Sequence, residues 1–318
     1  MREGQDVVSE KAGQGYDTVE IDHSPAGLDS YTLGPNLEKL IVQEPTFYGL
    51  GGCELTGNDL DNVITATTTA DKLVGAGGND TLYGGPIGEN ASEDTGAEDF
   101  FGGKGNDTIY GFGGDDTMSG QAGNDTMYGD AGNDRMVGGT GLDRLSGGGN
   151  EDIYDYNMLT DSKPGGSRDV VLDFEGVGTA GGDHIDLSTI DAVGGGTNNT
   201  FDFIGTNAFT GPGQVRVSPS GLDTLIQANT SGAAGTELEI KVSDGGDGRS
   251  SGPRATSSCS QGEGAAPAES PAAPLRPSVT GSRAETLAFS TRRVPRQPRH
   301  TWRRWGWRRR GRRRTSRR

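Results

Sequence analysis

The sequence predicts an all-β fold, a solenoid of short strands separated by glycine-rich turns. A nine-residue period runs from Gly75 to Asp155, and such a repeat is typical of a fold in which each unit packs only against its neighbours. Glycine contributes 56 of the 318 residues, whereas only 30% are hydrophobic and 6% aromatic, too few for an ordinary globular core of this length. No run of eighteen apolar residues is present to form a membrane-spanning helix.

The periodic region divides into nine blocks of nine residues: GAGGNDTLY, GGPIGENAS, EDTGAEDFF, GGKGNDTIY, GFGGDDTMS, GQAGNDTMY, GDAGNDRMV, GGTGLDRLS and GGGNEDIYD. Position six is Asp in seven blocks, and Glu89 and Glu98 occupy it in the other two. Position eight is apolar in every block: Leu82, Ala91, Phe100, Ile109, Met118, Met127, Met136, Leu145 and Tyr154. We therefore expect a turn over positions one to six, then a short strand that buries its position-eight side chain.

The residue types in the turns indicate cation binding. Glycines at positions one, two and four permit positive φ and close backbone approach, so carbonyl oxygens can point inward beside the carboxylate at position six. A flexible array of hard oxygen ligands suits Ca²⁺ better than Mg²⁺. The nine blocks carry 16 acidic and 3 basic residues, and stacking them without cations would bring like charges together. The alternative is a metal-free solenoid in which the same residues only form polar turns.

These blocks resemble the nonapeptide GGxGxDxUx of RTX (hemolysin-type) calcium-binding proteins. The resemblance implies a right-handed parallel β-roll, with two blocks in each coil and Ca²⁺ between loops 18 residues apart. One edge would then stack the loops at Gly75, Glu93, Gly111, Gly129 and Gly147, and the other those at Gly84, Gly102, Gly120 and Gly138. The clearest stacked pairs would be Asp107 with Asp125, Asp116 with Asp134, Asp125 with Asp143, and Asp134 with Asp152.

The candidate calcium ligands occupy positions one, three and six of the seven blocks that have Asp at position six. They are Gly75, Gly77, Asp80, Gly102, Lys104, Asp107, Gly111, Gly113, Asp116, Gly120, Ala122, Asp125, Gly129, Ala131, Asp134, Gly138, Thr140, Asp143, Gly147, Gly149 and Asp152. Two earlier acids, Asp59 and Asp71, either extend this series or serve as ordinary turn residues.

The predicted organisation has four parts. Residues 1–65 resemble the degenerate repeats that precede RTX nonapeptides, and residues 66–155 form the calcium-binding roll. Residues 156–245 resemble the serralysin-type C-terminal domain and form a small β cap, with antiparallel strands expected at 213–218, 223–228 and 236–244. Residues 249–318 form an arginine-rich tail that we expect to be disordered.

The tail differs sharply in composition from the preceding residues. It holds 18 Arg and 3 acidic residues, against 11 basic and 42 acidic residues in the first 248, and it lacks Asn, Asp, Ile, Lys, Met and Tyr. Codons for five of these begin with two A/T bases, so we interpret the tail as an out-of-frame reading of GC-rich DNA. The alternative is a basic, Trp-bearing arm for nucleic acid or anionic membrane.

Enzymatic motifs do not account for this chain. It has three histidines and neither an HExxH nor a GxSxG motif, and the GxGxxG match at 176–181 has no following helix. Two cysteines, Cys53 and Cys259, cannot form a disulfide framework. We expect a calcium-binding module rather than an enzyme, with Ca²⁺ as its ligand and no specific nucleic-acid partner.

The resemblance further implies an exported bacterial protein that folds in external calcium and uses a type I secretion apparatus. No N-terminal signal peptide is expected, and the usual C-terminal export signal is replaced by the tail. The alternatives are the C-terminal module of a secreted enzyme (protease, lipase or epimerase) and the spacer of a surface adhesin.

Overall fold

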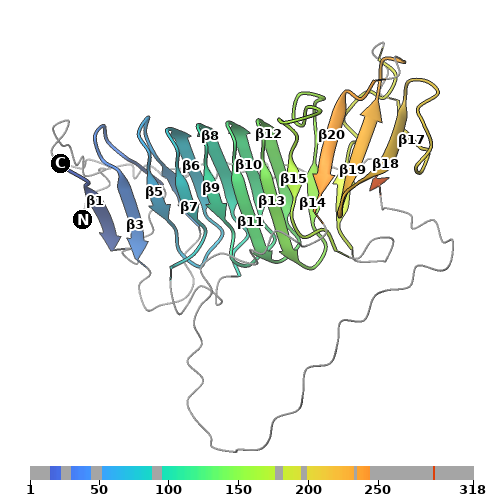
Figure 1. The fold of residues 1–318 in the computed structure, drawn as a ribbon. Helices are drawn as coiled ribbons and strands as arrows, with labels where there is room; N and C mark the ends of the chain where they lie inside the picture. Colours follow the sequence, from blue (N-terminus) through green and yellow to red (C-terminus); the bar gives the residue numbers. More distant parts are fainter. Residues whose placement is uncertain are drawn as a thin grey trace, which may run out of the picture.

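The computed structural model describes residues 15–22, 30–43, 52–87, 95–175, 182–194, 199–232, 235–243 and 289–290. All regular elements in these ranges are β-strands, and they form two long sheets (Figure 1). Up to β16 the chain alternates between the sheets, adding odd-numbered strands to one and even-numbered strands to the other. This alternation confirms the predicted parallel β-roll.

The first sheet has twelve strands. In spatial order they are β1 (Thr18–Asp22), β3 (Lys39–Gln43), β5 (Val63–Thr65), β7 (Thr81–Tyr83), β9 (Thr108–Tyr110), β11 (Thr126–Ala131), β13 (Arg144–Gly149), β15 (Val170–Val171), β20 (Leu238–Val242), β19 (Asp223–Asn229), β18 (Gln214–Ser220) and β17 (Asp202–Phe203). From β1 to β15 and on to β20, neighbouring strands are parallel.

The second sheet has nine strands, all paired in parallel. In spatial order they are β2 (Ser30–Thr32), β4 (Glu54–Thr56), β6 (Lys72–Gly77), β8 (Asp99–Lys104), β10 (Thr117–Ala122), β12 (Arg135–Thr140), β14 (Ile153–Asp155), β16 (His184–Asp186) and β21 (Phe289–Ser290).

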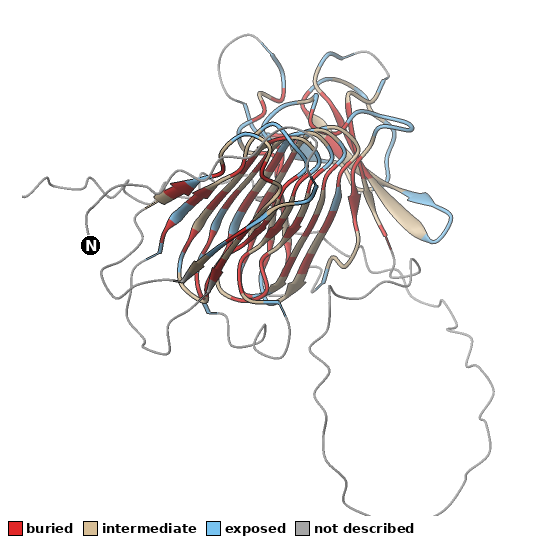
Figure 2. Cartoon of the chain, turned by 90° about the vertical axis from the view of Figure 1, so that its left-hand side faces the viewer, coloured by how far each residue is buried: buried red, intermediate tan, exposed pale blue. Residues whose placement is uncertain are grey.

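The interior of the roll is lined by one apolar side chain from each nonapeptide. The position-eight residues within the described ranges are fully buried: Leu82, Phe100, Ile109, Met118, Met127, Met136, Leu145 and Tyr154. Ala91, the ninth residue of this set, lies outside those ranges. Along repeat strands such as β11 and β12, buried residues alternate with partly exposed ones because successive side chains point to opposite faces, as Figure 2 shows.

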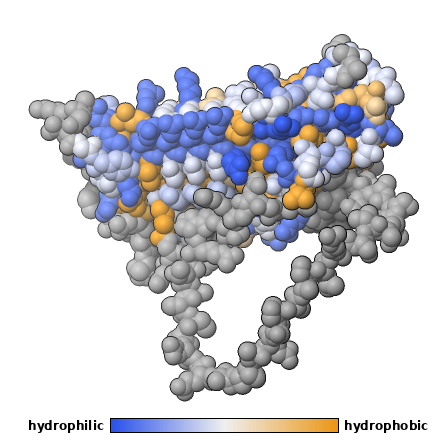
Figure 3. Space-filling model, viewed as in Figure 1, coloured by the Kyte–Doolittle hydropathy of each residue, from blue (hydrophilic) through white to orange (hydrophobic). Residues whose placement is uncertain are grey.

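The outward face of the first sheet carries ladders of identical residues. Tyr83, Tyr110 and Tyr128 occupy position nine in successive coils and stack with ring centroids 5.1 and 5.2 Å apart. The surface in Figure 3 is largely hydrophilic, with a continuous polar band running along the roll. The sequence period therefore separates an apolar interior from a polar exterior.

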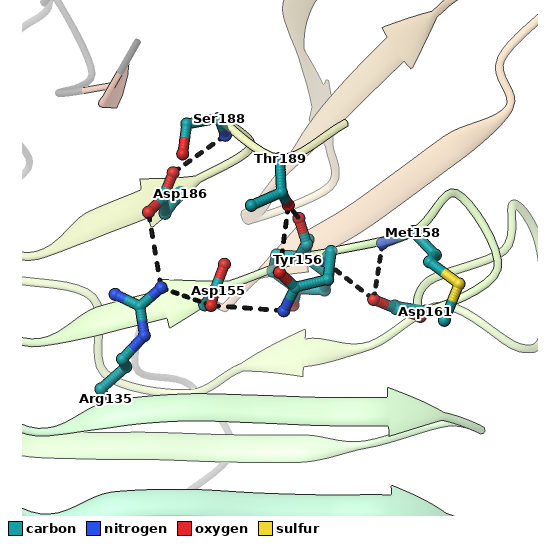
Figure 4. A network of polar contacts seen from close by, with 9 residues as sticks. Arg135, Asp155, Tyr156, Met158, Asp161, Asp186, Ser188 and Thr189 are labelled. Atoms are coloured by element: carbon teal, nitrogen blue, oxygen red, sulfur yellow. Dashed lines mark hydrogen bonds and ion pairs between the residues drawn. The ribbon is translucent and has the colours of Figure 1, made fainter. Parts of the chain in front are cut away.

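The cap continues the first sheet. Strands β18, β19 and β20 pair in antiparallel fashion, as predicted, and β20 then pairs in parallel with β15. Within the second sheet, Arg135 Nη2 lies 2.5 Å from Asp155 Oδ2 and 3.7 Å from Asp186 Oδ2 (Figure 4). This guanidinium therefore links β12, β14 and β16.

The prediction for the tail falls almost entirely outside the described residues. Within 249–318 the structure describes only Phe289 and Ser290, which pair with Ile185 and Asp186 of β16. A membrane-spanning helix is absent from the described part of the chain.

Candidate metal centre

The position-six aspartates end the turns of the roll, and each lies immediately before a strand. We call the seven of them the rung aspartates. They are Asp80, Asp107, Asp116, Asp125, Asp134, Asp143 and Asp152, each no more than 1% exposed. Their burial follows from the local sequence, because the next-but-one residue is the apolar side chain that points into the core.

One carboxylate oxygen of each rung aspartate accepts a backbone hydrogen bond from the preceding coil on the same sheet. The amide N–H of Asp107 donates to Asp125 Oδ1 (2.8 Å), and that of Asp125 donates to Asp143 Oδ1 (2.8 Å). On the other edge, Asp116 and Asp134 donate in the same way to Asp134 and Asp152, each over 2.9 Å. The four predicted stacked pairs are therefore present.

The second oxygen, Oδ2, has no hydrogen-bond partner in any of the seven rung aspartates, although it is buried. A buried charged oxygen without a partner is costly, so such atoms call for a compensating group. The seven unpartnered oxygens lie in two rows, one formed by Asp80, Asp107, Asp125 and Asp143 and the other by Asp116, Asp134 and Asp152. Bound cations would compensate these oxygens.

The glycine at position one lies against Oδ2 and leaves no room there for a Cβ atom. A Cβ atom added to Gly120 would lie 2.2 Å from Asp125 Oδ2 and 2.7 Å from the carbonyl oxygen of Gly138 in the next coil. At Gly129 the corresponding distances are 2.1 Å to Asp134 Oδ2 and 2.7 Å to the Gly147 carbonyl. Position one therefore requires glycine for close approach, which brings a carboxylate and a carbonyl oxygen together.

The expectation of positive φ at position one is wrong, since the left-handed residues occupy positions two and four. Position four is glycine in Gly123 (φ 139°) and Gly132 (φ 144°), whereas position two tolerates Phe112 (72°), Gln121 (74°) and Asp130 (69°). The turn thus bends at two points and keeps the position-one residue extended along its strand.

The position-three residues place their carbonyl oxygens at the contact between coils. The Ala122 carbonyl accepts the amide of Gly105 over 2.9 Å, and the Thr140 carbonyl accepts that of Gly123 over 3.0 Å. A carbonyl has a second lone pair, so these oxygens can still coordinate a cation. No three His, Cys, Asp or Glu side chains gather at one point in the described ranges, so a cation there needs backbone carbonyls as well.

Burial raises the pKa of the rung aspartates. The pKa rises to about 7 in Asp80, Asp125 and Asp152 and to about 8 in Asp134, chiefly through desolvation, with neighbouring acidic side chains adding to it. The backbone hydrogen bond to Oδ1 acts in the opposite direction. The site therefore disfavours bare negative charge and favours its neutralisation.

The predicted stacking is wrong at the start of the roll. Lys72 in β6 pairs with Asp99 in β8, and Thr81 in β7 pairs with Thr108 in β9, so one coil is 27 residues long instead of 18. Gly75 therefore stacks on Gly102, and Gly84 on Gly111, rather than on Glu93 and Gly102. Asp80 accordingly donates its amide N–H to Asp107 Oδ1 over 2.8 Å.

The physical reason is an extra block between β7 and β8. β7 ends at Tyr83 and β8 begins at Asp99, which leaves nine residues more between them than between β9 and β10, and this segment is where the motif is most degenerate. Glu89 and Glu93 lie outside the described residues. Glu98 remains in the stack and donates its amide to Asp116 Oδ1 over 2.8 Å.

Two further aspartates continue the rows beyond the repeats. Asp169 Oδ1 accepts the amide of Asp143 over 3.0 Å, and Asp183 Oδ1 accepts that of Asp152 over 3.1 Å. Period analysis missed them because their spacings are 26 and 31 residues. A weaker signal was present, since DVV and DHI repeat the pattern of an Asp two residues before a buried apolar side chain.

Comparison with known protein families decides the identity of this region. The family model for the RTX calcium-binding nonapeptide repeat (4 copies) matches residues 56–86, 94–127 and 128–158. These residues are RTX repeats. The match omits residues 87–93, which lie in the extra block of the long coil.

Other comparisons add little to the RTX assignment. No curated protein matches the chain. Among solved structures, the chain is similar to the AlgE6R3 subunit of the mannuronan C5-epimerase from Azotobacter vinelandii. The identity is 24%, the alignment covers 52% of this chain and 87% of the other, and the TM-score is 0.22.

The RTX repeats are calcium-binding sequences, and the residues of this roll fit that ion. Carboxylate and carbonyl oxygens are the hard, flexible donor set that Ca²⁺ takes. The rung aspartates and the carbonyls at positions one and three are the groups that would hold it.

Proposed function

We propose that residues 56–158 form a calcium-dependent folding module of an exported protein, with the rung aspartates and the neighbouring carbonyls as ligands. The observation that carries the proposal is the two rows of buried, unpartnered Oδ2 atoms, one atom for each rung aspartate. Each represents a cost to the folded chain that a bound cation would remove.

The coupling of calcium to folding follows from the distribution of stabilising contacts. Each nonapeptide buries one large apolar side chain, which contributes roughly 1.5–3 kcal/mol, while ordering its backbone costs about 1–2 kcal/mol per residue. Calcium bound only by the folded state adds to its stability in proportion to the logarithm of the concentration. Low cytosolic calcium would therefore keep the chain open, and millimolar external calcium would fold it.

In this proposal the described residues act as a binding scaffold and supply no catalytic group. Export through a type I apparatus is compatible with it, because a chain unfolded in the cytosol can pass a narrow channel. The module would then acquire its fold outside the cell.

Far-UV circular dichroism of the full chain during calcium titration tests the proposal, with magnesium as the matched control. We expect a cooperative gain of β signal with calcium and none with magnesium at equal concentration. A β signal that is already complete in chelator, or an equal response to both ions, would refute it.

A further inference from the structure

The rungs at the N-terminal side of the roll differ from those of the repeats. The residue immediately before a strand, which is a rung aspartate in the repeats, is Cys53 before β4, Asn62 before β5 and Asp71 before β6. Cys53 is 3% exposed, Asn62 1% and Asp71 3%, so all three are buried, as the rung aspartates are. Two of these three side chains are neutral.

Asn62 satisfies its own polar atoms within the chain. Its Oδ1 accepts the amide of Asn58 over 2.7 Å, and its Nδ2 donates to the Leu37 carbonyl over 3.2 Å. A side-chain amide replaces the carboxylate here, and internal hydrogen bonds occupy the donor and the acceptor. No buried charge remains at this rung.

Asp71 keeps its charge but has partners for both oxygens. Oδ1 accepts the amide of Cys53 over 2.6 Å, and Oδ2 accepts the amide and the hydroxyl of Thr67 over 3.0 and 2.7 Å. The rung aspartates lack any equivalent of the Thr67 contacts. A carboxylate with several hydrogen-bond donors is stabilised without a cation.

The N-terminal part of the roll from residue 30 to 71, which ends with this coil, has a denser apolar interior than the repeats. In 30–43 and 52–71, the described residues of this part, the buried hydrophobic residues are Tyr31, Leu33, Leu37, Leu40 and Val42 before the coil and Cys53, Leu55, Ile64 and Ala66 within it. The repeats bury about one such side chain every nine residues, so this part of the roll draws more of its stability from burial. The cation-free arrangement does not extend to the start of the described chain, since Asp17, immediately before β1, again has a buried Oδ2 without a partner.

We propose that the coil from Cys53 to Asp71 folds without calcium and serves as the template on which the first calcium-dependent coil assembles. The backbone N–H of Asn62 donates to Asp80 Oδ1 over 2.8 Å, and the backbone carbonyl of Asn62 accepts the N–H of Thr81 over 2.8 Å. The preformed coil thus positions the first rung aspartate before any ion binds. This inference rests on the proposed calcium-dependent folding of the repeats.

Hydrogen exchange of the full chain, with and without chelator, tests the inference at amides with matched backbone hydrogen bonds. Val63 and Lys72 report on the template, and Thr126 and Arg135 report on the repeats; all four bonds are 2.8 Å long. In chelator we expect Val63 and Lys72 to exchange at least about 100-fold more slowly than unfolded chain, and Thr126 and Arg135 near the unfolded rate. Calcium should then protect the second pair.

The outcomes separate the two proposals. If all four amides are unprotected in chelator and gain protection together in calcium, the template is refuted and calcium-dependent folding stands. If all four are equally protected in chelator, calcium-dependent folding is refuted and the distinction between coils falls with it.

Asn62→Asp supplies a second test, because it turns the neutral rung into an acidic one. In chelator we expect exchange at Val63 and Lys72 to accelerate by at least about tenfold, since an unpaired carboxylate becomes buried. Asn106→Asp is the matched control, because Asn106 is exposed and its Oδ1 accepts the Asn124 amide, which Asp can also do. Equal effects of the two variants on these amides would overturn the inference.

Discussion

The substitution Asp134→Asn is expected to have opposite effects with and without calcium. Asp134 is 1% exposed, its Oδ1 accepts the amide of Asp116 over 2.9 Å, and its Oδ2 has no partner. Asn keeps the acceptor at Oδ1 and the shape of the side chain while removing the charge. The calcium-free fold should therefore gain stability and the calcium-bound fold should lose it.

The magnitude follows from the raised pKa of Asp134. Burial moves this pKa from 3.8 to about 8, and one pKa unit corresponds to about 1.4 kcal/mol. At pH 7 the calcium-free fold must hold Asp134 protonated although this carboxyl is ionised in the unfolded chain. The interval from 3.8 to pH 7 makes that cost roughly 4 kcal/mol. The buried Nδ2 donor that Asn introduces costs about 1–3 kcal/mol, which leaves a net gain on the order of 2 kcal/mol.

The assay compares the folded fraction of the two proteins by far-UV circular dichroism. In chelator, a trimethylamine N-oxide titration drives folding, and the variant should need less osmolyte than the parent. In a calcium titration, the variant should need at least about tenfold more calcium, because a charged ligand is lost.

The control is Asp115→Asn, at an exposed aspartate in the turn of the preceding coil, one residue before Asp116. Asp115 Oδ1 accepts the amide of Asn133 over 2.9 Å, and Asn preserves that bond. It should change stability by no more than about 0.5 kcal/mol in either condition. If Asp134→Asn destabilises the chain equally in chelator and in calcium, the rung aspartates are not uncompensated charges and the reasoning fails.

Three other predictions concern the turn geometry and the acidity of the rungs. Gly120→Ala should destabilise the calcium-loaded roll by about 1–3 kcal/mol in denaturant unfolding, because the added Cβ would lie 2.2 Å from Asp125 Oδ2. Gly166→Ala is the control and should have little effect, since the space around Gly166 is open. Equal effects of the two variants would count against the close-approach role of position one. Gln121→Gly should raise stability by about 1 kcal/mol in the same experiment, since a left-handed φ of 74° strains any residue with a Cβ; a gain no larger than that of Gln121→Ala would contradict this. In chelator, acidification from pH 8 to pH 4 should increase the folded fraction. The raised pKa values of the rung aspartates make the folded state bind more protons than the unfolded state over this range. A circular dichroism signal of β-structure that falls between pH 8 and pH 4 would contradict this prediction.

Several features of the roll were determined by the sequence alone. The position-eight residues are all buried where they are described, because a strand of period two after each turn can place only that side chain inward. The pairs from Asp107–Asp125 to Asp134–Asp152 follow from the 18-residue coil. Both depend on local periodicity, which is directly visible in the residue order.

Only the tertiary structure decided how the coils stack where their length changes. The switch of Gly75 onto Gly102 depends on a 27-residue coil, and a turn between two strands can hold extra residues without altering which strands pair. Asp169 and Asp183 join the rows from 26 and 31 residues away for the same reason.

The distinction between charged and compensated rungs also required the tertiary structure. Asp71 and Asp80 are both acids before a strand, yet only Asp71 has Thr67 within hydrogen-bonding distance of its second oxygen. Hydrogen-bond satisfaction depends on which groups meet across coils, and residue order alone does not contain that information. The sequence by itself determined the period, the inward side chains and the carboxylates. The packing of one coil on the next decided the register of the rows and which of those carboxylates keep a buried oxygen without a partner.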